Sequence, residues 1–261
     1  MNNAKIENLY DLDKTIAADL FKGHEYPWEL LPLIGDFIKE LGAKLDPEVY
    51  EKRGEDIWVA KSAKVFDSAY LSGPLIIDEN HADEYIKRGD DVWIHKTATV
   101  FDSAYIHGPA IIGAETEVRQ CAFVRGNALV GKGCVVGNST ELKNVIIFDN
   151  VQVPHYNYVG DSILGFKSHM GAGSITSNVK SDKTLVVVKG YDENADLEIE
   201  TGLKKFGAML GDYVEVGCNS VLNPGSVIGR HTNIYPLSPI RGYVPENSIV
   251  KTGNVIISKR S

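Results

Sequence analysis

The chain has 261 residues, of which 43% are hydrophobic and 24% are charged, and its formal net charge is −8. This length and composition are those of an ordinary folded protein with one large domain, and the negative charge argues against nucleic acid and anionic membranes as partners. The sequence shows no apolar segment of signal-peptide or membrane-spanning length. Its three cysteines lack the paired spacing of a zinc ribbon or a disulfide framework. We therefore expect a cytoplasmic protein without a structural metal.

The first 53 residues are expected to form a helical cap. The runs LDKTIAADLF and PWELLPLIGDFIKELGAKL place apolar residues at spacings of three and four, which is typical of amphipathic helices. Pro27 lies near an expected helix start and Gly42 near an expected stop, whereas Pro32 predicts a break or a kink. We expect residues 1–53 to pack as a cap on a larger domain that spans residues 54–261.

From about Ile57 onward the sequence repeats with a period of six residues. An aliphatic residue recurs at every sixth position from Ile94 to Leu142 and, after single-residue slips and an interruption, again from Leu210 to Ile240. Such a period fits a coil of three short flat faces, in which about 18 residues make one turn and successive turns stack about 4.8 Å apart. This is the hexapeptide signature of a parallel β-helix.

Two segments depart from the simple repeat. Residues 50–78 match residues 85–113 at 18 of 29 positions, so we interpret them as a duplicated start of the β-helix that lengthens it. Residues 181–209 break the six-residue period, and the runs TLVVVKG and ADLEIET within them predict a hairpin arm. Long insertions in solenoids tend to lie on a binding face or at a subunit contact.

The geometry of a solenoid converts this spacing into predicted contacts. Arg125 and Lys143 lie one expected turn apart, and each directly follows an inward aliphatic residue. They should therefore stack at one corner of adjacent coils, with backbones about 5 Å apart, and His107 should occupy the same corner one coil earlier. Two cations so placed repel by about 1–3 kcal/mol, unless a phosphate or carboxylate lies between them. The pattern thus indicates either an anion site or a solvated basic column.

The stretch VPHYNYVGDSILG places His155 two residues after the inward Val153. The same position holds Asn138 one coil earlier and Ala172, within the run GAG, one coil later. Such a side chain points outward from the coil. In a cleft between subunits it would be a candidate general base, because an imidazole ordinarily has a pKa near 6.5. The glycines around Ala172 leave room for a ligand to approach the backbone.

The run HYNYVGDSILGFKSHMGAGSITSN resembles the acetyltransferase domain of the bacterial bifunctional N-acetylglucosamine-1-phosphate uridyltransferase/glucosamine-1-phosphate acetyltransferase. It also resembles the C-terminal β-helix of archaeal sugar-1-phosphate nucleotidylyltransferases. That family has a histidine, then Tyr-x-Gly-Asp, Gly-Ala-Gly and an asparagine, with an arginine and a lysine upstream at the same separations. The resemblance covers roughly residues 110–245 and implies a left-handed coil. We therefore expect a mainly β fold: a left-handed parallel β-helix (hexapeptide repeat) with a short N-terminal α-helical cap and a hairpin arm.

The resemblance implies a role for each matching residue. His155 would take a proton from the attacking amine, and Asn178 would orient the histidine or the substrate. Arg125 and Lys143 would hold the sugar phosphate, and Tyr158 would contact the phosphate or the sugar. The remaining counterparts are two further substrate contacts, His169 and Lys183, and two positions that line the acetyl-CoA groove, Ala172 and Cys218.

The resemblance also implies acetyl-CoA as the acyl donor, backbone N–H groups that stabilise the tetrahedral oxyanion, and a homotrimer with sites between subunits. Two positions depart from the family pattern: His169 stands where the family has an asparagine, and Lys183 is displaced by one residue. The glycine-rich GxGTR phosphate loop of the nucleotidyltransferase domain is missing from residues 1–110. We therefore do not expect pyrophosphorylase activity.

These observations predict an acetyl-CoA-dependent transferase acting on an amino-sugar phosphate, such as glucosamine-1-phosphate, or on a related sugar nucleotide. Two alternatives use the same scaffold. One is an O-acetyltransferase with another sugar acceptor, and the other is a non-catalytic trimeric module for sugar-phosphate or nucleotide binding or for assembly. A zinc hydrolase is disfavoured, because the seven histidines include no close His-x4-His pair.

Overall fold

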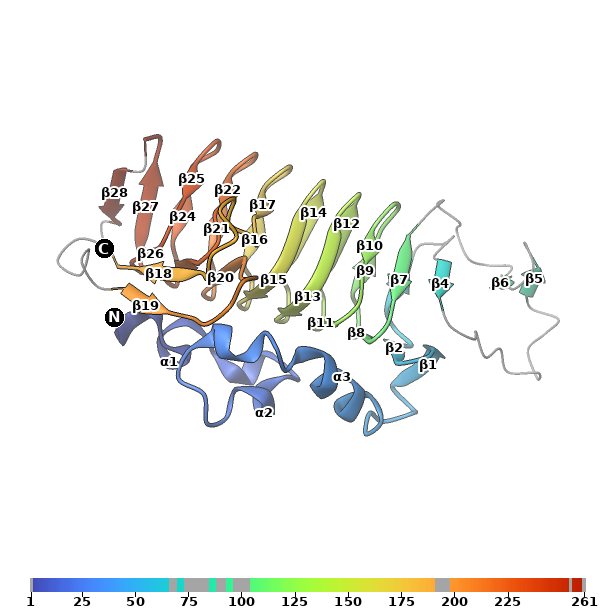
Figure 1. The fold of residues 1–261 in the computed structure, drawn as a ribbon. Helices are drawn as coiled ribbons and strands as arrows, with labels where there is room; N and C mark the ends of the chain where they lie inside the picture. Colours follow the sequence, from blue (N-terminus) through green and yellow to red (C-terminus); the bar gives the residue numbers. More distant parts are fainter. Residues whose placement is uncertain are drawn as a thin grey trace.

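The computed structural model describes residues 2–65, 70–72, 85–87, 93–95, 104–190, 198–253 and 255–259. Within them a parallel β-helix runs the length of the molecule, with short helices along one side (Figure 1). The coil is left-handed, as the resemblance implied. Val124 pairs with Leu142, and Leu142 pairs in turn with Val159, so consecutive turns stack as the six-residue period predicts. The expected fold class is therefore confirmed.

The coils have three flat faces, each a ladder of parallel strands. The first face consists of β4 (Tyr70–Ser72), β7 (Tyr105–His107), β10 (Phe123–Val124), the first halves of β13 (Glu141–Ile147) and β15 (Tyr158–Leu164), β17 (Ile175–Thr176), β22 (Val221–Leu222) and β25 (Pro239–Ile240). The second face consists of β2 (Ile57–Ala60), β8 (Ala110–Ile112), β11 (Ala128–Val130), the second halves of β13 and β15, β20 (Ala208–Leu210), β23 (Ser226–Ile228) and β26 (Tyr243–Val244). The third face consists of β3 (Lys64–Val65), β9 (Glu117–Val118), β12 (Val135–Asn138), β14 (Gln152–His155), β16 (His169–Met170), β21 (Glu215–Val216), β24 (Asn233–Ile234) and β27 (Ser248–Lys251).

The corners between faces have a recurrent local structure. Buried side chains there satisfy backbone carbonyls: Thr140 Oγ1 donates to Val153 O at 2.9 Å, and Asn157 Nδ2 donates to Gly171 O at 2.9 Å. Residues with a positive φ turn the chain at these corners. At the corner between the third and first faces these residues are Cys121, Ser139, Tyr156, Gly173, Asn219 and Leu237. The corners therefore stack in register, and residues at equivalent positions form columns along the coil.

Short helices precede the β-helix. They are η1 (Asn2–Ala4), α1 (Ile6–Leu9), η2 (Leu12–Lys14), α2 (Ala18–Phe21), η3 (Pro27–Leu30) and α3 (Ile34–Gly42). The helix expected over residues 12–21 is broken, because Thr15 is extended and its hydroxyl accepts the Ala17 N–H at 3.1 Å. Pro32 lies in the predicted break, between η3 and α3. Among the described residues, no helix is long and apolar enough to span a membrane.

The N-terminal helices cover the outer side of the second face (Figure 1). The outward side chains of that face are apolar and as buried as the inward ones: Ile111, Leu129, Ile146 and Ile163 are all fully buried. A face that is apolar on both sides needs a cover, because each exposed aliphatic side chain costs about 1.5–3 kcal/mol relative to a buried one. The division of the chain into two domains at residue 53 stays a prediction.

A buried carboxylate fixes the N-terminal segment to the coil. Asp212 is only 2% exposed, and it accepts the Asp11 N–H at 2.7 Å and the Phe166 N–H at 2.8 Å. Its own N–H donates to Leu9 O at 2.9 Å, and Arg230 Nη2 lies 3.3 Å from its carboxylate. Burial raises the pKa of Asp212 in spite of these partners.

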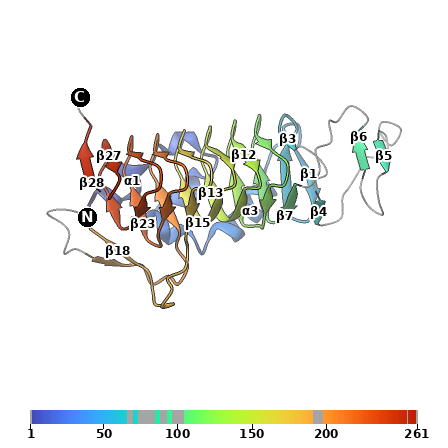
Figure 2. The same ribbon diagram turned by 90° about the horizontal axis from the view of Figure 1, so that it is seen from above.

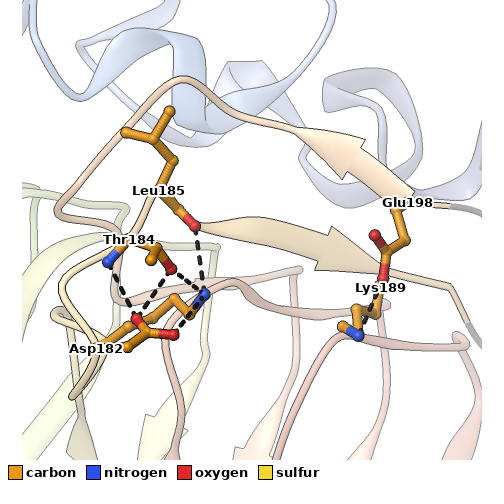
Figure 3. A network of polar contacts seen from close by, with 6 residues as sticks. Asp182, Thr184, Leu185, Lys189 and Glu198 are labelled. Atoms are coloured by element: carbon orange, nitrogen blue, oxygen red, sulfur yellow. Dashed lines mark hydrogen bonds and ion pairs between the residues drawn. The ribbon is translucent and has the colours of Figure 1, made fainter.

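The predicted hairpin arm is present. β18 (Val187–Lys189) and β19 (Glu198–Glu200) pair antiparallel, and Figures 1 and 2 show them alongside the coil. The arm lies close to the β-helix: an added Cβ at Gly225, where φ is +84°, would come within 2.9 Å of Val186 Cγ1. Figure 3 shows the polar contacts at the base of the arm, where Asp182 accepts the Thr184 N–H at 3.0 Å. Farther along, Lys189 forms an ion pair with Glu198 at 2.9 Å.

Short antiparallel strands border the ends of the coil. β1 (Tyr50–Gly54) pairs with β2, and β28 (Val255–Ser258) pairs with β27. β5 (Tyr85–Lys87) and β6 (Trp93–His95) form a sheet of their own.

The duplicated segment does not simply extend the coil. Leu71 of β4 pairs directly with Ile106 of β7, and Trp58 of β2 pairs directly with Ile111 of β8, so the chain between each pair of strands is much longer than one turn. The strand β6, which is the sequence copy of part of β2, pairs with β5 and does not join the second face. Residues 66–69, 73–84, 88–92 and 96–103 lie outside the described residues. The first copy nevertheless lengthens the coil as expected, because its strands β2, β3 and β4 stack on β8, β9 and β7.

Candidate functional site

The corner between the first and second faces brings together four of the predicted residues. We name it the arginine corner, and it comprises Arg125, Lys143, Tyr158 and Asn178. Arg125 stacks on Lys143, because its N–H donates to Leu142 O at 2.8 Å in a parallel ladder. The register of β10 with β7 places His107 in the same column, one strand before Arg125. The predicted cation stack is present.

An acidic side chain that we did not single out from the sequence lies beside Arg125. Glu141 Oε1 is 2.6 Å from Arg125 Nη1, and the guanidinium also lies 5.7 Å from the centre of the Phe123 ring. Because strand side chains alternate, Glu141 points outward like Lys143, two residues farther along β13. That alternation was the signal that could have revealed it. Its charge offsets part of the repulsion between Arg125 and Lys143.

Tyr158 extends over the backbone of the arginine corner. An added Cβ at Gly160 would lie only 2.4 Å from the Tyr158 hydroxyl oxygen, so the glycine makes room for the ring. Burial raises the pKa of Tyr158, and the negative charges of Asp161 and Glu141 raise it further. A hydrogen bond with the Asn178 side chain partly opposes this rise in the pKa. The phenol is therefore a neutral hydrogen-bonding group at ordinary pH.

A buried carboxylate lies beneath these residues. Asp161 is 4% exposed, and it accepts Asn144 Nδ2 at 2.9 Å and Asn178 Nδ2 at 2.5 Å. Asn144 Nδ2 also donates to Leu31 O, in the N-terminal segment, at 3.1 Å. The sequence motif contains Asp161, but we had not predicted it as a site residue. Its role depends on these contacts, which repeat spacing does not show.

Three other predicted residues lie at the corner between the third and first faces. We name it the histidine corner, and it comprises His155, Ala172 and Cys218. The Gly173 N–H donates to His155 O at 3.0 Å and the Asn219 N–H donates to Ala172 O at 2.9 Å, so the three residues stack in consecutive coils. His155 and Cys218 are exposed, and Ala172 is partly exposed. His155 points outward, as predicted.

The two corners lie at opposite edges of the first face. His155 ends β14 before the turn at Tyr156, whereas Gly160, the residue that stacks on Lys143, lies at the far end of the first-face half of β15. One chain therefore does not place His155 beside the cations of the arginine corner.

The last two predicted residues lie away from both corners. His169 is on the third face, where its Nδ1 lies 2.9 Å from Glu215 Oε2. Lys183 is exposed in the arm, and its N–H donates to Lys180 O at 3.0 Å. In the described part of the chain, no three or more metal-ligating side chains gather into a group.

The fold and the stacked corners define a hexapeptide-repeat protein of the left-handed β-helix class. A family model described as the GMPPB C-terminal domain matches residues 106–234, a range that includes both corners. The bifunctional protein GlmU of Methanococcus maripaludis is 34% identical over 140 residues, which are 53% of this chain and 33% of that protein. A bifunctional sugar-1-phosphate nucleotidylyltransferase/acetyltransferase of Sulfurisphaera tokodaii is 35% identical over 101 residues, which are 39% of this chain and 24% of that protein.

The resemblance expected from the motifs is thus confirmed for about half of the chain. The chain spans about a third of the length of the GlmU relatives. Among solved structures, a mutant of AntD, an N-acyltransferase from Bacillus cereus, is 11% identical with a TM-score of 0.36, covering 84% of this chain and 89% of that one. A hexapeptide transferase family protein from Anaplasma phagocytophilum is 13% identical with a TM-score of 0.32, covering 76% and 80%. Scores this low carry no inference about the site.

Proposed function

We propose that the chain is an acetyl-CoA-dependent acyltransferase whose acceptor is an amino-sugar phosphate or a related sugar nucleotide. The observation that carries the proposal is the stack of Arg125 on Lys143. This stack lies within residues 106–234, which match the family model, and one relative of the chain is named as a sugar-1-phosphate nucleotidylyltransferase/acetyltransferase. The exposed His155 lies at the far edge of the first face.

The arginine corner has the groups that a phosphate needs. Arg125 offers a planar fork of donors, and Lys143 offers a compact charge one coil away. Glu141 occupies one side of the Arg125 guanidinium. A phosphate bound between the cations would remove their mutual repulsion, so the free energy of binding should depend on the charge of the acceptor. Tyr158 and Asn178 would contact the sugar beside it.

His155 would supply the acid–base chemistry. As the acceptor amine adds to the thioester carbonyl of acetyl-CoA, the neutral imidazole takes the amine proton. Collapse of the tetrahedral intermediate breaks the C–S bond, and the thiolate of coenzyme A leaves and receives that proton. Backbone N–H groups would stabilise the oxyanion between these steps. On this proposal Ala172 and Cys218 line the acyl-donor groove, and His169 and Lys183 contact the substrate.

The proposed site requires a second copy of the chain. Within one chain the two corners lie at opposite edges of the first face, whereas the reacting amine of a sugar phosphate lies close to its phosphate. Large apolar side chains are exposed along the first face and the histidine corner: Phe123 is 38% exposed, Tyr156 66% and Leu237 72%. Such exposed apolar groups favour an interface. In a closed homotrimer, the histidine corner of one subunit would face the arginine corner of the next.

The test is the release of thiol from acetyl-CoA with a panel of amino-sugar phosphates and nucleotide sugars. His155→Ala should lower the rate about 10²- to 10⁴-fold. His231→Ala, which removes an exposed histidine at another corner, should leave the rate unchanged. Equal rates for wild type and His155→Ala would exclude His155 as the base.

Two other outcomes would support the alternatives. Turnover only with hydroxyl acceptors would indicate an O-acetyltransferase. If no acceptor turned over but glucosamine-1-phosphate raised the melting temperature, the chain would be a binding module, because a ligand that binds only the native state stabilises it.

A further inference from the structure

Asn178 lies at the neck of the arm, where the chain leaves the β-helix after β17 and rejoins it at β20. Two backbone hydrogen bonds close this neck. The Phe206 N–H donates to Asn178 O at 3.0 Å, and the Gly207 N–H donates to Asp161 O at 2.8 Å. An added Cβ at Gly207 would lie 2.2 Å from Gly160 O, so the returning chain packs directly on the arginine corner.

The side-chain hydrogen bonds at the neck determine which way the amide of Asn178 faces. An asparagine amide has two N–H donors and one carbonyl acceptor. Asn178 Nδ2 donates to Asp161 Oδ2 at 2.5 Å, and Asn178 is also hydrogen-bonded to Tyr158. With its NH₂ group held by the buried carboxylate, the Asn178 amide has a fixed orientation beside Tyr158.

The N-terminal segment supports this arrangement at two points. Both N–H groups of the Asn144 amide have partners, Leu31 O at 3.1 Å and Asp161 Oδ1 at 2.9 Å. The buried ring of Trp28 stacks on the buried ring of Phe206, with centroids 5.6 Å apart. The backbone N–H of Phe206 donates to the backbone carbonyl of Asn178. The side chain of Asn178 is thus connected to the N-terminal segment through Asp161 and Asn144. Its backbone is connected to the same segment through Phe206.

We propose that Asp161 is a positioning residue that orients Asn178 and Tyr158 toward the acceptor, and that the N-terminal segment holds Asp161 through Asn144. The inference rests on the proposed function, because the acceptor-binding role of Asn178 and Tyr158 belongs to it. Asp161 itself is buried beneath both residues and does not need to touch the acceptor. The N-terminal segment is then a part of the acceptor site, although the matched family region begins only at residue 106.

The variant Asp161→Asn tests the orientation with little change in shape. Asp161 has a φ of +48°, and asparagine tolerates this conformation as well as aspartate does. One carboxylate oxygen becomes an NH₂ group, which must then face the NH₂ group of Asn144 or of Asn178. We expect the KM for the acceptor to rise about 10- to 100-fold, the loss typical of a binding group displaced by about 1 Å. The KM for acetyl-CoA should stay within about twofold, because the donor groove lies at the histidine corner.

Asn144→Gly removes the connection to Leu31. Glycine adopts the φ of +54° found at Asn144 without strain. The variant loses the hydrogen bonds to Leu31 O and to the Asp161 carboxylate, which predicts a rise of about 10- to 100-fold in the KM for the acceptor. Asp212→Asn is the matched control: it also removes a buried carboxylate that binds the N-terminal segment, but at another corner. It should lower the melting temperature and leave both KM values unchanged.

The outcomes separate this inference from the proposed function. If Asp161→Asn changed both KM values equally, or neither, Asp161 would not be a positioning residue. If the wild type turned over no acceptor, the proposed function would fail, and a crystal structure of Asp161→Asn would still test the positioning. We expect Asn178 and Tyr158 to leave their places in that structure, and their unchanged positions would overturn the inference.

Discussion

The substitution Gly160→Ala introduces a single methyl group into the arginine corner. The methyl carbon would lie 2.4 Å from the Tyr158 hydroxyl oxygen and 2.7 Å from its Cζ, whereas an ordinary contact is about 3.5 Å or more. The Tyr158 ring must therefore move by about 1 Å. The cost to stability should be near the low end of the range for overpacking, about 1 kcal/mol, because the ring is half-buried and can swing outward.

The expected effect on activity is larger than the effect on stability. A displacement of about 1 Å in a binding group lowers kcat/KM for the acceptor about 10- to 100-fold, and the KM for acetyl-CoA should not change. Tyr158→Ala removes the ring that the methyl group would strike. In that background Gly160→Ala should have no further effect, which corresponds to a coupling free energy of about 1.4–2.7 kcal/mol.

The assay is a double-mutant cycle on kcat/KM for the acceptor, with urea unfolding of all four proteins as the control for stability. If Gly160→Ala lowered kcat/KM by the same factor with and without the Tyr158 ring, its effect would not run through Tyr158. That result would refute the placement of the ring over the arginine corner.

Two further predictions concern the N-terminal segment. Leu129→Ala, at a fully buried outward position of the second face, should cost about 2–5 kcal/mol of unfolding free energy, whereas Leu33→Ala, at a position 40% exposed, should cost less than about 1 kcal/mol. Equal urea midpoints for the two would show that the segment does not cover this face. Burial raises the pKa of Asp212, so the folded state binds this proton more tightly than the unfolded state. The unfolding free energy of wild type, measured relative to that of Asp212→Asn, should therefore increase as the pH falls from 7 toward about 4. A difference that stayed constant across that range would contradict this.

The coil could be predicted from the sequence because its period is a rigid geometric rule. Once the length of a turn is known, the stacking of Arg125 on Lys143 and the outward position of His155 follow without any knowledge of distant contacts. The hairpin arm was equally visible, since its two apolar runs flank a polar turn region.

Contacts between segments without a common period could not be predicted. Asn144 donates to Leu31, a residue 113 positions earlier, and no repeat relates the two. The break at Thr15 depends on a local side-chain hydrogen bond that competes with the helix. The position of β6 outside the second face was likewise hidden, because an internal copy has the same local pattern whether or not it joins the coil. The separation of His155 from the cations follows from the six-residue period, because the inward Val153 and Val159 lie on different faces.

Complementation between two inactive variants tests whether two copies of the chain complete each site. His155→Ala keeps an intact arginine corner, and Arg125→Ala keeps an intact histidine corner. Each variant alone should be nearly inactive in thiol release from acetyl-CoA.

When the two variants are unfolded together in equal amounts and refolded, subunits mix at random. About a quarter of the interfaces then pair an intact His155 with an intact Arg125, so we expect about a quarter of the wild-type activity. A mixture no more active than the two separate variants would contradict a site built between subunits.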